Sequence, residues 1–188
     1  HPLFRETLKY FDVKTPINIA SHADIPSGTG LGSSGSFTVC LINAILKLKN
    51  RTYSKKKISE IAFEIEHHIL REPVGKQDQY ACALGGVNQF YFNKNNSVSV
   101  KKINLSNNSL NNLNKKLVIF FTGYSRDSYK ILNFQNKQTL NLNKEMIKNL
   151  DMIKEIGKVS KKALEKRNFN EFGEIMNHHW QLKKKKII

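Results

Sequence analysis

A glycine-rich segment at residues 26–36 limits how this chain can fold more than any other feature of the sequence. It reads Pro-Ser-Gly-Thr-Gly-Leu-Gly-Ser-Ser-Gly-Ser and joins a run with strand character (17–22) to an apolar, helix-like stretch that opens at Ser33 or Ser34. Glycine lets the backbone turn sharply and approach a ligand closely, and a helix start adds unpaired amides. The segment therefore predicts a cradle for nucleotide phosphates. A glycine-rich surface turn is the alternative that the glycines alone leave open.

Two known phosphate-binding patterns fail to describe this segment. A P-loop ends in Gly-Lys-Ser/Thr, whereas residues 26–36 contain no lysine. Residues 30–35 match the dinucleotide pattern, but that pattern also requires an acidic residue about twenty positions later. The corresponding region, Tyr-Ser-Lys-Lys-Lys at 53–57, has no acidic residue before Glu60. A dinucleotide-dependent dehydrogenase is therefore disfavoured.

Composition narrows the class of protein further. The chain has 188 residues, of which 39% are apolar and 24% charged, as expected for one globular domain or a large part of one. The net charge is +16, but lysines are scattered and no cluster of basic and aromatic residues is present, so no specific nucleic-acid partner is predicted. No apolar run is long enough to span a membrane. Cys40 and Cys82 lack metal-type spacing and predict two reduced core thiols.

The order of expected elements indicates an α+β fold. Helices and strands mix without regular alternation, which argues against a doubly wound sheet. The expected elements are a helix within 3–11, a strand at 17–22, a helix at 34–49, a helix capped by Ser54 and ended by Pro73, a short helix at 77–84 closed by Gly85 and Gly86, a hairpin of 87–92 with 97–103, an Asn-rich loop, a buried strand at 117–122, and helices from 127 onward with breaks near Asn141 and Asn168.

Residues 26–34 match every fixed position of Pro-x-Gly-x-Gly-Leu-Gly-Ser-Ser, and the chain thereby resembles the GHMP kinases. Gly35 departs from the pattern, since alanine is more usual there, and we expect a mild effect. The resemblance implies ATP as phosphate donor and the GHMP kinase fold, with part of the ribosomal protein S5 domain 2-like N-terminal domain in 1–105 and the start of the helical C-terminal domain in 106–188. It also implies a nucleotide-binding set of Pro26, Gly28, Thr29, Gly30, Leu31, Gly32, Ser33, Ser34 and Gly35.

Phosphoryl transfer requires a phosphate cradle, oxygen ligands for a metal ion, and a group that accepts the proton of the acceptor hydroxyl. The resemblance to GHMP kinases implies that Ser34 and Glu66 hold Mg²⁺ and that Asp78 is the general base. Without that resemblance, Glu66 reads as a charge at the boundary of a buried helix face. Asp78, which precedes a short helix, equally reads as an N-cap.

Within the superfamily, residues 66–71 and 75–80 most resemble the D-glycero-D-manno-heptose 7-phosphate kinases. These enzymes phosphorylate the anomeric hydroxyl of a sugar phosphate on the way to nucleotide-activated heptose and surface polysaccharide. The resemblance implies a sugar-phosphate substrate, and Gly75, Gln77 and Arg126 are candidates for binding it. Two alternatives stay open, another small-molecule GHMP kinase of the fucokinase or mevalonate kinase type, and a remnant without catalytic activity.

The resemblance covers the middle of the family's length. We expect an N-terminal segment before His1 and a glycine-rich C-terminal motif after Lys184, and hence a chain that is an internal fragment or the product of a broken reading frame. On that expectation the 188-residue chain alone is not a competent kinase. The function and the reduced thiols together indicate the cytoplasm.

Overall fold

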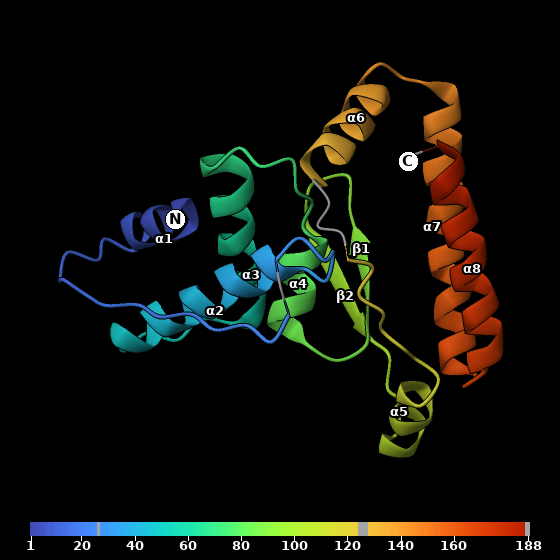
Figure 1. The fold of residues 1–188 in the computed structure, drawn as a ribbon, viewed down its shortest axis with the longest axis horizontal. Coiled ribbons are helices and arrows are strands. Elements are labelled where there is room, and N and C mark those ends of the chain that lie inside the picture. Colours follow the sequence, from blue (N-terminus) through green and yellow to red (C-terminus); the bar gives the residue numbers. More distant parts are fainter. Residues whose placement is uncertain (26, 124–127, 187–188) are drawn as a thin grey trace. The chain divides into compact units, whose positions relative to one another are not determined.

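Helices dominate the structure, a computed structural model that describes residues 1–25, 27–123 and 128–186 (Figure 1). One two-stranded antiparallel sheet accompanies them, so the α+β class predicted from the sequence is confirmed. The elements are α1 (Pro2–Tyr10), α2 (Ser33–Leu48), α3 (Lys55–Phe63), the π-helical segment η1 (Glu64–Ile69), α4 (Gln77–Leu84), β1 (Asn88–Phe92), β2 (Val98–Lys102), α5 (Asn107–Asn114), α6 (Ser128–Leu140), α7 (Lys144–Glu165) and α8 (Phe169–Lys186).

The chain divides into two compact units. The first consists of His1–Gly85 with Phe121–Lys130, and the second of Gly86–Phe120 with Ile131–Ile188. The first segment of the first unit ends at Gly85, before the hairpin, whereas the domain boundary expected from the family resemblance follows residue 105. Compact units and family domains need not coincide, so that domain assignment stays a prediction.

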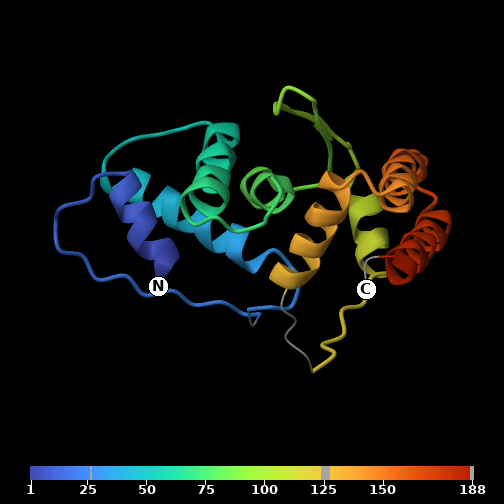
Figure 2. The same ribbon diagram turned by 90° about the horizontal axis from the view of Figure 1, so that it is seen from above.

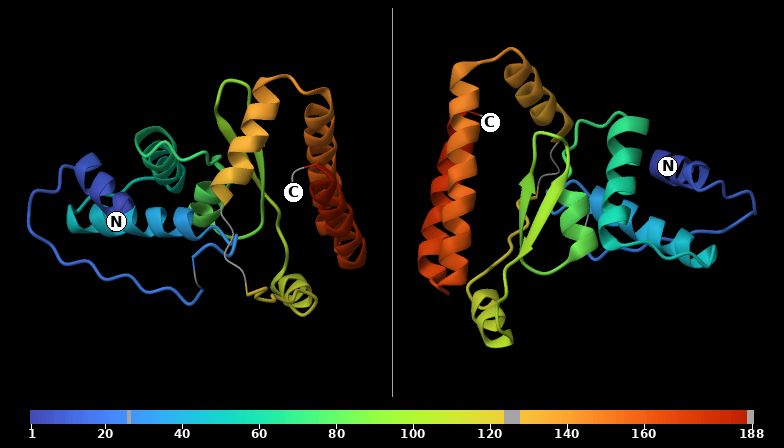
Figure 3. Two further views of the ribbon diagram at one scale, coloured as in Figure 1. Left: turned by 45° about the horizontal axis from the view of Figure 1, so that its top comes forward. Right: turned by 180° about the vertical axis from the view of Figure 1, so that it is seen from behind.

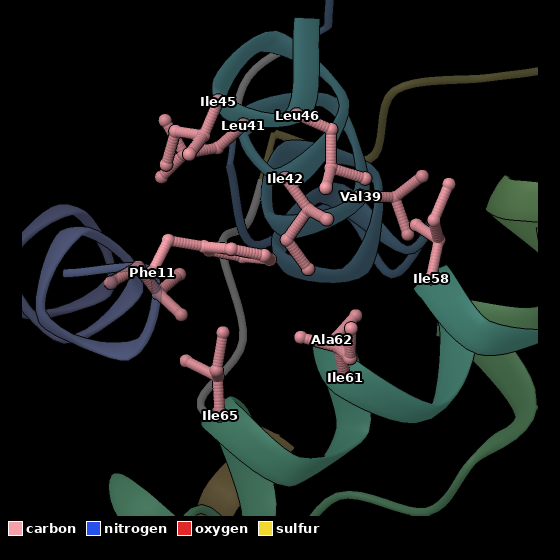
Figure 4. Packing of buried hydrophobic residues seen from close by; sticks show 11 residues of the cluster. Phe11, Val39, Leu41, Ile42, Ile45, Leu46, Ile58, Ile61, Ala62 and Ile65 are labelled. Carbon is pink, nitrogen blue, oxygen red and sulfur yellow. The ribbon is translucent and has the colours of Figure 1, made fainter. Parts of the chain in front are cut away.

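Helix α2 is the centre of the first unit, because α1, α3 and α4 all pack against it. Its sequence is apolar on several sides, as the prediction of a buried helix required. Figure 4 shows Ile42 and Ile45 of α2 pointing toward Phe11, which follows α1, and toward Ile61 and Ile65 on the α3–η1 segment. Helix α3 begins where predicted, since the Ser54 hydroxyl accepts a hydrogen bond from the Lys57 amide at 3.2 Å.

Helix α3 does not continue to Pro73 as a regular helix. It changes into the wider η1 turn, in which the Leu70 amide donates to the Ile65 carbonyl at 3.0 Å, and the Glu72 amide donates to the Glu66 carbonyl at 3.0 Å. The chain then leaves the helix through Arg71, whose φ is +59°. Single π-helical turns of this kind often occur at functional sites. Here the turn buries two consecutive side chains, Ile65 and Glu66.

The second unit contains the predicted hairpin and a pair of long helices. Strands β1 and β2 pair antiparallel with Phe90 opposite Val100, and the Asn93 amide donates to the Ser97 carbonyl at 2.9 Å to close the turn. Helices α7 and α8 lie side by side, seen nearly end-on in Figure 2 and lengthwise in Figure 3. Arg167, with φ of +59°, turns the chain between them near the break predicted at Asn168. Among the described helices, none combines the length and the apolar character needed to cross a bilayer.

The two strands predicted at 17–22 and 117–122 are wrong. Both segments are described, and neither forms a strand. A strand must exchange backbone hydrogen bonds with a neighbour, and in the described part of the chain neither segment is paired in a sheet. Residues 117–122 are moreover exposed rather than buried, with Phe120 81% exposed.

Two smaller predictions also fail. The Asn-rich stretch predicted as a loop contains α5, because the Ser106 hydroxyl caps it by accepting from the Ser109 amide at 3.2 Å and Leu113 packs into a small core. Cys40 was predicted to be a core thiol, but it lies on an exposed face of α2, and Cys82 is half-buried.

Candidate active site

The glycine loop adopts the backbone conformation for which its alternating glycines were singled out. Gly28, Gly30 and Gly32 have φ values of +77°, +79° and +72°, in the left-handed region that side chains with a Cβ rarely enter. Gly32 is also the N-cap of α2, so the first-turn amides of this helix receive no hydrogen bond from a capping side chain. An N-terminus of this kind is suited to bind an anion.

The other predicted loop residues surround this helix start. Ser34 lies in the first turn of α2 and is exposed, Thr29 and Ser33 are half-buried, and Leu31 is exposed. Pro26 lies outside the described residues. The loop therefore presents a hydroxyl side chain beside the free amides, as the predicted phosphate site requires.

Glu66 is buried beneath this helix start rather than placed at a boundary with solvent. Its side chain on η1 is 1% exposed, and Gln79 on α4 and Ser34 on α2 are near enough to act on its carboxyl group. Burial raises the pKa of Glu66, the hydrogen bonds from Gln79 and Ser34 oppose that rise, and the nearby charge of Asp78 adds to it. The reading of Glu66 as a boundary charge is therefore wrong.

Asp78 lies in the first turn of α4 and faces the glycine loop. The N-cap of α4 is Lys76, so the reading of Asp78 as an N-cap is also wrong. A Cβ on Gly32 would lie 3.6 Å from Cγ of Asp78, and a Cβ on Gly35 would lie 3.2 Å from its Cβ and carbonyl carbon. The Asp78 side chain is exposed. A carboxylate thus stands at the surface directly beside the predicted phosphate cradle.

At Gly35, α2 and α4 approach each other closely. An alanine there would press against the backbone of Asp78 and Gln79 at 3.2 Å, so α4 would have to move by a few tenths of an ångström. The expectation that an exchange between alanine and glycine at position 35 has only a mild effect is therefore too simple. In this chain the missing side chain lets α4 bring Asp78 and Gln79 against the first turn of α2.

Cys82 is the second residue of α4 that contacts the glycine loop. Its Sγ lies 3.8 Å from the Gly32 carbonyl, to which the thiol donates a weak hydrogen bond. Burial raises the pKa of the Cys82 thiol, and the negative charges of Asp78 and Glu66 raise it further. The thiol is therefore held in its neutral form under the loop.

The buried oxygens of the site fit a hard divalent cation. Oε1 of Glu66 and Oε1 of Gln79 are buried, and neither has a hydrogen-bond partner among the described residues. A buried polar atom without a partner carries a large desolvation cost, so each oxygen requires a proton donor or a cation. Carboxylate, hydroxyl and carbonyl oxygens are the ligands that Mg²⁺ prefers. The arrangement of Ser34, Glu66 and Asp78 therefore suits such an ion.

The remaining predicted residues are not gathered into this cluster. Gly75 is exposed just before α4, and Gln77 is exposed as the first residue of α4. None of the described atoms lies within 4 Å of a Cβ built on Gly75. Arg126 lies outside the described residues. Sequence reasoning missed Gln79, which is 1% exposed. Its only signal in the sequence was its position next to Asp78 in a short helix, and that does not reveal burial.

Parts of this chain are similar to known kinases. The family model of the GHMP kinases N terminal domain matches residues 2–86. The chain is 30% identical over 184 residues to the D-glycero-alpha-D-manno-heptose 7-phosphate kinase of Campylobacter jejuni. The aligned region covers 97% of this chain and 53% of that protein. It is 27% identical over 176 residues to a mevalonate kinase of Saccharolobus solfataricus, covering 92% of this chain and 52% of that protein.

Two further proteins are similar to this chain. The bifunctional fucokinase/GDP-fucose pyrophosphorylase of Arabidopsis thaliana is 24% identical over 170 residues, or 89% of this chain and 16% of that protein. A crystal structure of a D-glycero-D-manno-heptose 1-phosphate kinase from Bacteroides thetaiotaomicron superposes with a TM-score of 0.79 at 26% identity, over 98% of this chain and 55% of that one.

The chain spans about half the length of the Campylobacter and Saccharolobus relatives. Within that span, the glycine loop, the buried glutamate and the aspartate of α4 all fall in the part that the family model matches. Over residues 2–86, this chain therefore matches the family of GHMP kinase N-terminal domains.

Proposed function

We propose that the protein carrying this chain is an ATP-dependent kinase that phosphorylates the anomeric hydroxyl of a sugar phosphate, D-glycero-D-manno-heptose 7-phosphate. Its product would serve the synthesis of nucleotide-activated heptose for surface polysaccharide. The observation that carries the proposal is the convergence of Ser34, Glu66 and Asp78, from three separate helical segments, at the uncapped start of α2. The similarity to two heptose phosphate kinases supports the choice of substrate.

In this proposal the loop from Gly28 to Gly35 binds the phosphates of ATP through its backbone amides. Ser34 and Glu66 would hold Mg²⁺, with the partnerless Oε1 of Glu66 as an acidic ligand. Bound there, the ion would neutralise negative charge on the nucleotide phosphates.

Asp78 would accept the proton of the anomeric hydroxyl. As that oxygen bonds to the γ-phosphorus, the bond from the γ-phosphorus to the bridging oxygen breaks, and ADP leaves with the electron pair. The exposure of Asp78 supports this role, because the acceptor hydroxyl must be able to reach it. Gly75, Gln77 and Arg126 remain predicted contacts for the sugar phosphate, and the cytoplasmic location remains a prediction.

The substrate is tested by ADP release from the purified protein, in the length that its gene encodes. Heptose 7-phosphate, fucose, galactose and mevalonate are compared at equal concentration with ATP and Mg²⁺. We expect heptose 7-phosphate to give the highest kcat/KM. A preference for mevalonate or a free sugar would overturn the heptose assignment, because mevalonate kinase and fucokinase relatives match the same region.

A further inference from the structure

We propose that Gln79 is a positioning residue that holds the Glu66 carboxylate so that its Oε1 stays free to bind the cation. This inference rests on the proposed function, since it concerns the metal site of the same reaction. No role was assigned to Gln79 from the sequence.

The side chains of Gln79 and Glu66 are both buried, which restricts how they can interact. Both Gln79 and Glu66 are 1% exposed, and hydrogen bonding from Gln79 opposes the rise in the pKa of Glu66 that burial causes. A carboxylate can only accept, so the group that Gln79 presents to Glu66 is its NH₂ donor. Among the described residues, Oε1 of Glu66 has no hydrogen-bond partner, so Gln79 acts on the other carboxylate oxygen.

The carbonyl of Gln79 strengthens the argument. Its Oε1 is a second buried oxygen without a partner among the described residues. Two buried acceptors on neighbouring side chains would be a costly arrangement for a purely structural contact. A bound cation with its water molecules would satisfy both, the ion at Glu66 and a water molecule donating to Gln79.

The backbone around Gln79 is also held in place. Its amide nitrogen would lie 3.2 Å from a Cβ on Gly35, so α4 rests tightly on the first turn of α2 at this residue. The next residue, Tyr80, is 1% exposed and anchors α4 to α3. Gln79 therefore has little freedom to move, which is the property required of a residue that orients a metal ligand.

The test measures Mn²⁺ binding by electron paramagnetic resonance, in the presence of a saturating non-hydrolysable ATP analogue. Gln79→Met keeps the length and volume of the side chain but removes the donor and the carbonyl. Loss of an outer-shell partner typically weakens metal affinity by about 10- to 100-fold, and we expect that change here. Asn149→Leu is the matched control, because Asn149 on α7 is an equally buried amide whose side chain has no hydrogen-bond partner in the described part of the chain.

Glu66→Gln separates this inference from the proposed function. If wild type binds Mn²⁺, Glu66→Gln loses that binding and Gln79→Met retains wild-type affinity, the role of Gln79 is overturned while the proposed site stands. If wild type binds no Mn²⁺, both are overturned. A purely structural role would lower the melting temperature of Gln79→Met and leave the Mn²⁺ affinity of the folded protein unchanged, which also overturns the inference.

Gln79→Glu keeps the proposal testable if Gln79→Met does not fold. It preserves the shape of the side chain and places a second carboxylate beside Glu66. Repulsion between the two carboxylates should lower the melting temperature without metal, and Mn²⁺ should raise it by more than in wild type. An Mn²⁺-dependent rise equal to that of wild type would show that Gln79 does not face the cation.

Discussion

The carboxylates of Asp78 and Glu66 lie in opposite surroundings. Asp78 is exposed beside the glycine loop, whereas Glu66 is buried beneath it. Environments that differ in this way assign different tasks to identical chemical groups. An exposed carboxylate can meet the hydroxyl of an incoming substrate, while a buried one with an unpartnered oxygen is suited to a cation.

The role of Asp78 leads to a first prediction. Asp78→Asn preserves size and hydrogen bonding but removes the base, so kcat should fall roughly 10²-fold or more while nucleotide affinity changes little. Single-turnover kinetics and calorimetric nucleotide titration measure the two effects separately. Asp151→Asn, an exposed aspartate on α7, is the control and should behave as wild type. A near-normal kcat for Asp78→Asn would remove this residue from the mechanism.

The glycine loop supports a second prediction. Gly32→Val should abolish nucleotide binding, because φ is +72° and the new Cβ would lie 3.6 Å from Asp78 and 3.7 Å from Cys82 Sγ. The left-handed conformation alone costs about 1–2 kcal/mol for a residue with a Cβ. Gly86→Val is the matched control, since its φ is +73° but none of the described atoms lies within 4 Å of a Cβ there. It should lose stability and still bind nucleotide, as calorimetry can show.

At the scale of elements, the contact between α3 and α4 keeps the aspartate in place. The Tyr80 hydroxyl on α4 donates to Oε1 of Glu60 on α3 at 3.4 Å. Burial raises the pKa of Tyr80 to about 12, and the charge and hydrogen bond of Glu60 contribute to the rise. Because α4 also carries Asp78, Gln79 and Cys82, this contact supports the whole α4 side of the site.

The raised pKa of Tyr80 gives a third prediction. The folded protein favours the neutral phenol, so the stabilisation is fully present below the ordinary tyrosine pKa of about 10 and is lost as pH rises toward 12. An absorbance titration of tyrosinate should therefore show one of the six tyrosines ionising late. Tyr80→Phe should remove that late step alone. If the late step persists in Tyr80→Phe, the assignment to Tyr80 is wrong.

At the scale of the whole molecule, the most unusual surface is the apolar run 117–121, Leu-Val-Ile-Phe-Phe. Val118, Ile119 and Phe120 are 70%, 75% and 81% exposed. Single exposed apolar residues are common on proteins, but a contiguous run of high β-propensity favours association. This run is the strand predicted at 117–122, which in the described part of the chain pairs with no other strand.

The exposed run leads to a fourth prediction. In the 188-residue chain, Phe120→Lys should reduce concentration-dependent self-association and leave the melting temperature unchanged, because the wild-type side chain buries little surface. Light scattering and a thermal melt measure the two quantities. Leu140→Lys removes an apolar residue that is 82% exposed outside the run, and its effect on self-association should be smaller. Equal effects of the two variants would contradict a specific role for 117–121.

Features that depend on neighbours in the sequence were predictable from the sequence. The bounds of α4, the Ser54 cap of α3, the hairpin and the left-handed glycines at 28, 30 and 32 all agree with the structure. Each follows from a local cause: capping hydrogen bonds, turn residues, helical periodicity, or the freedom of glycine at positive φ. Nine residues of the glycine loop also sufficed to indicate the GHMP kinase family, which the comparisons confirm.

Features that depend on distant segments were decided by the tertiary structure. The sequence could not show that Glu66 is buried, that Gln79 joins it, or that Gly35 lets α4 approach α2, because each depends on packing between separate helices. The same reason explains the two failed strands at 17–22 and 117–122. A helix satisfies its backbone hydrogen bonds within itself, whereas a strand satisfies them only when a partner strand lies beside it.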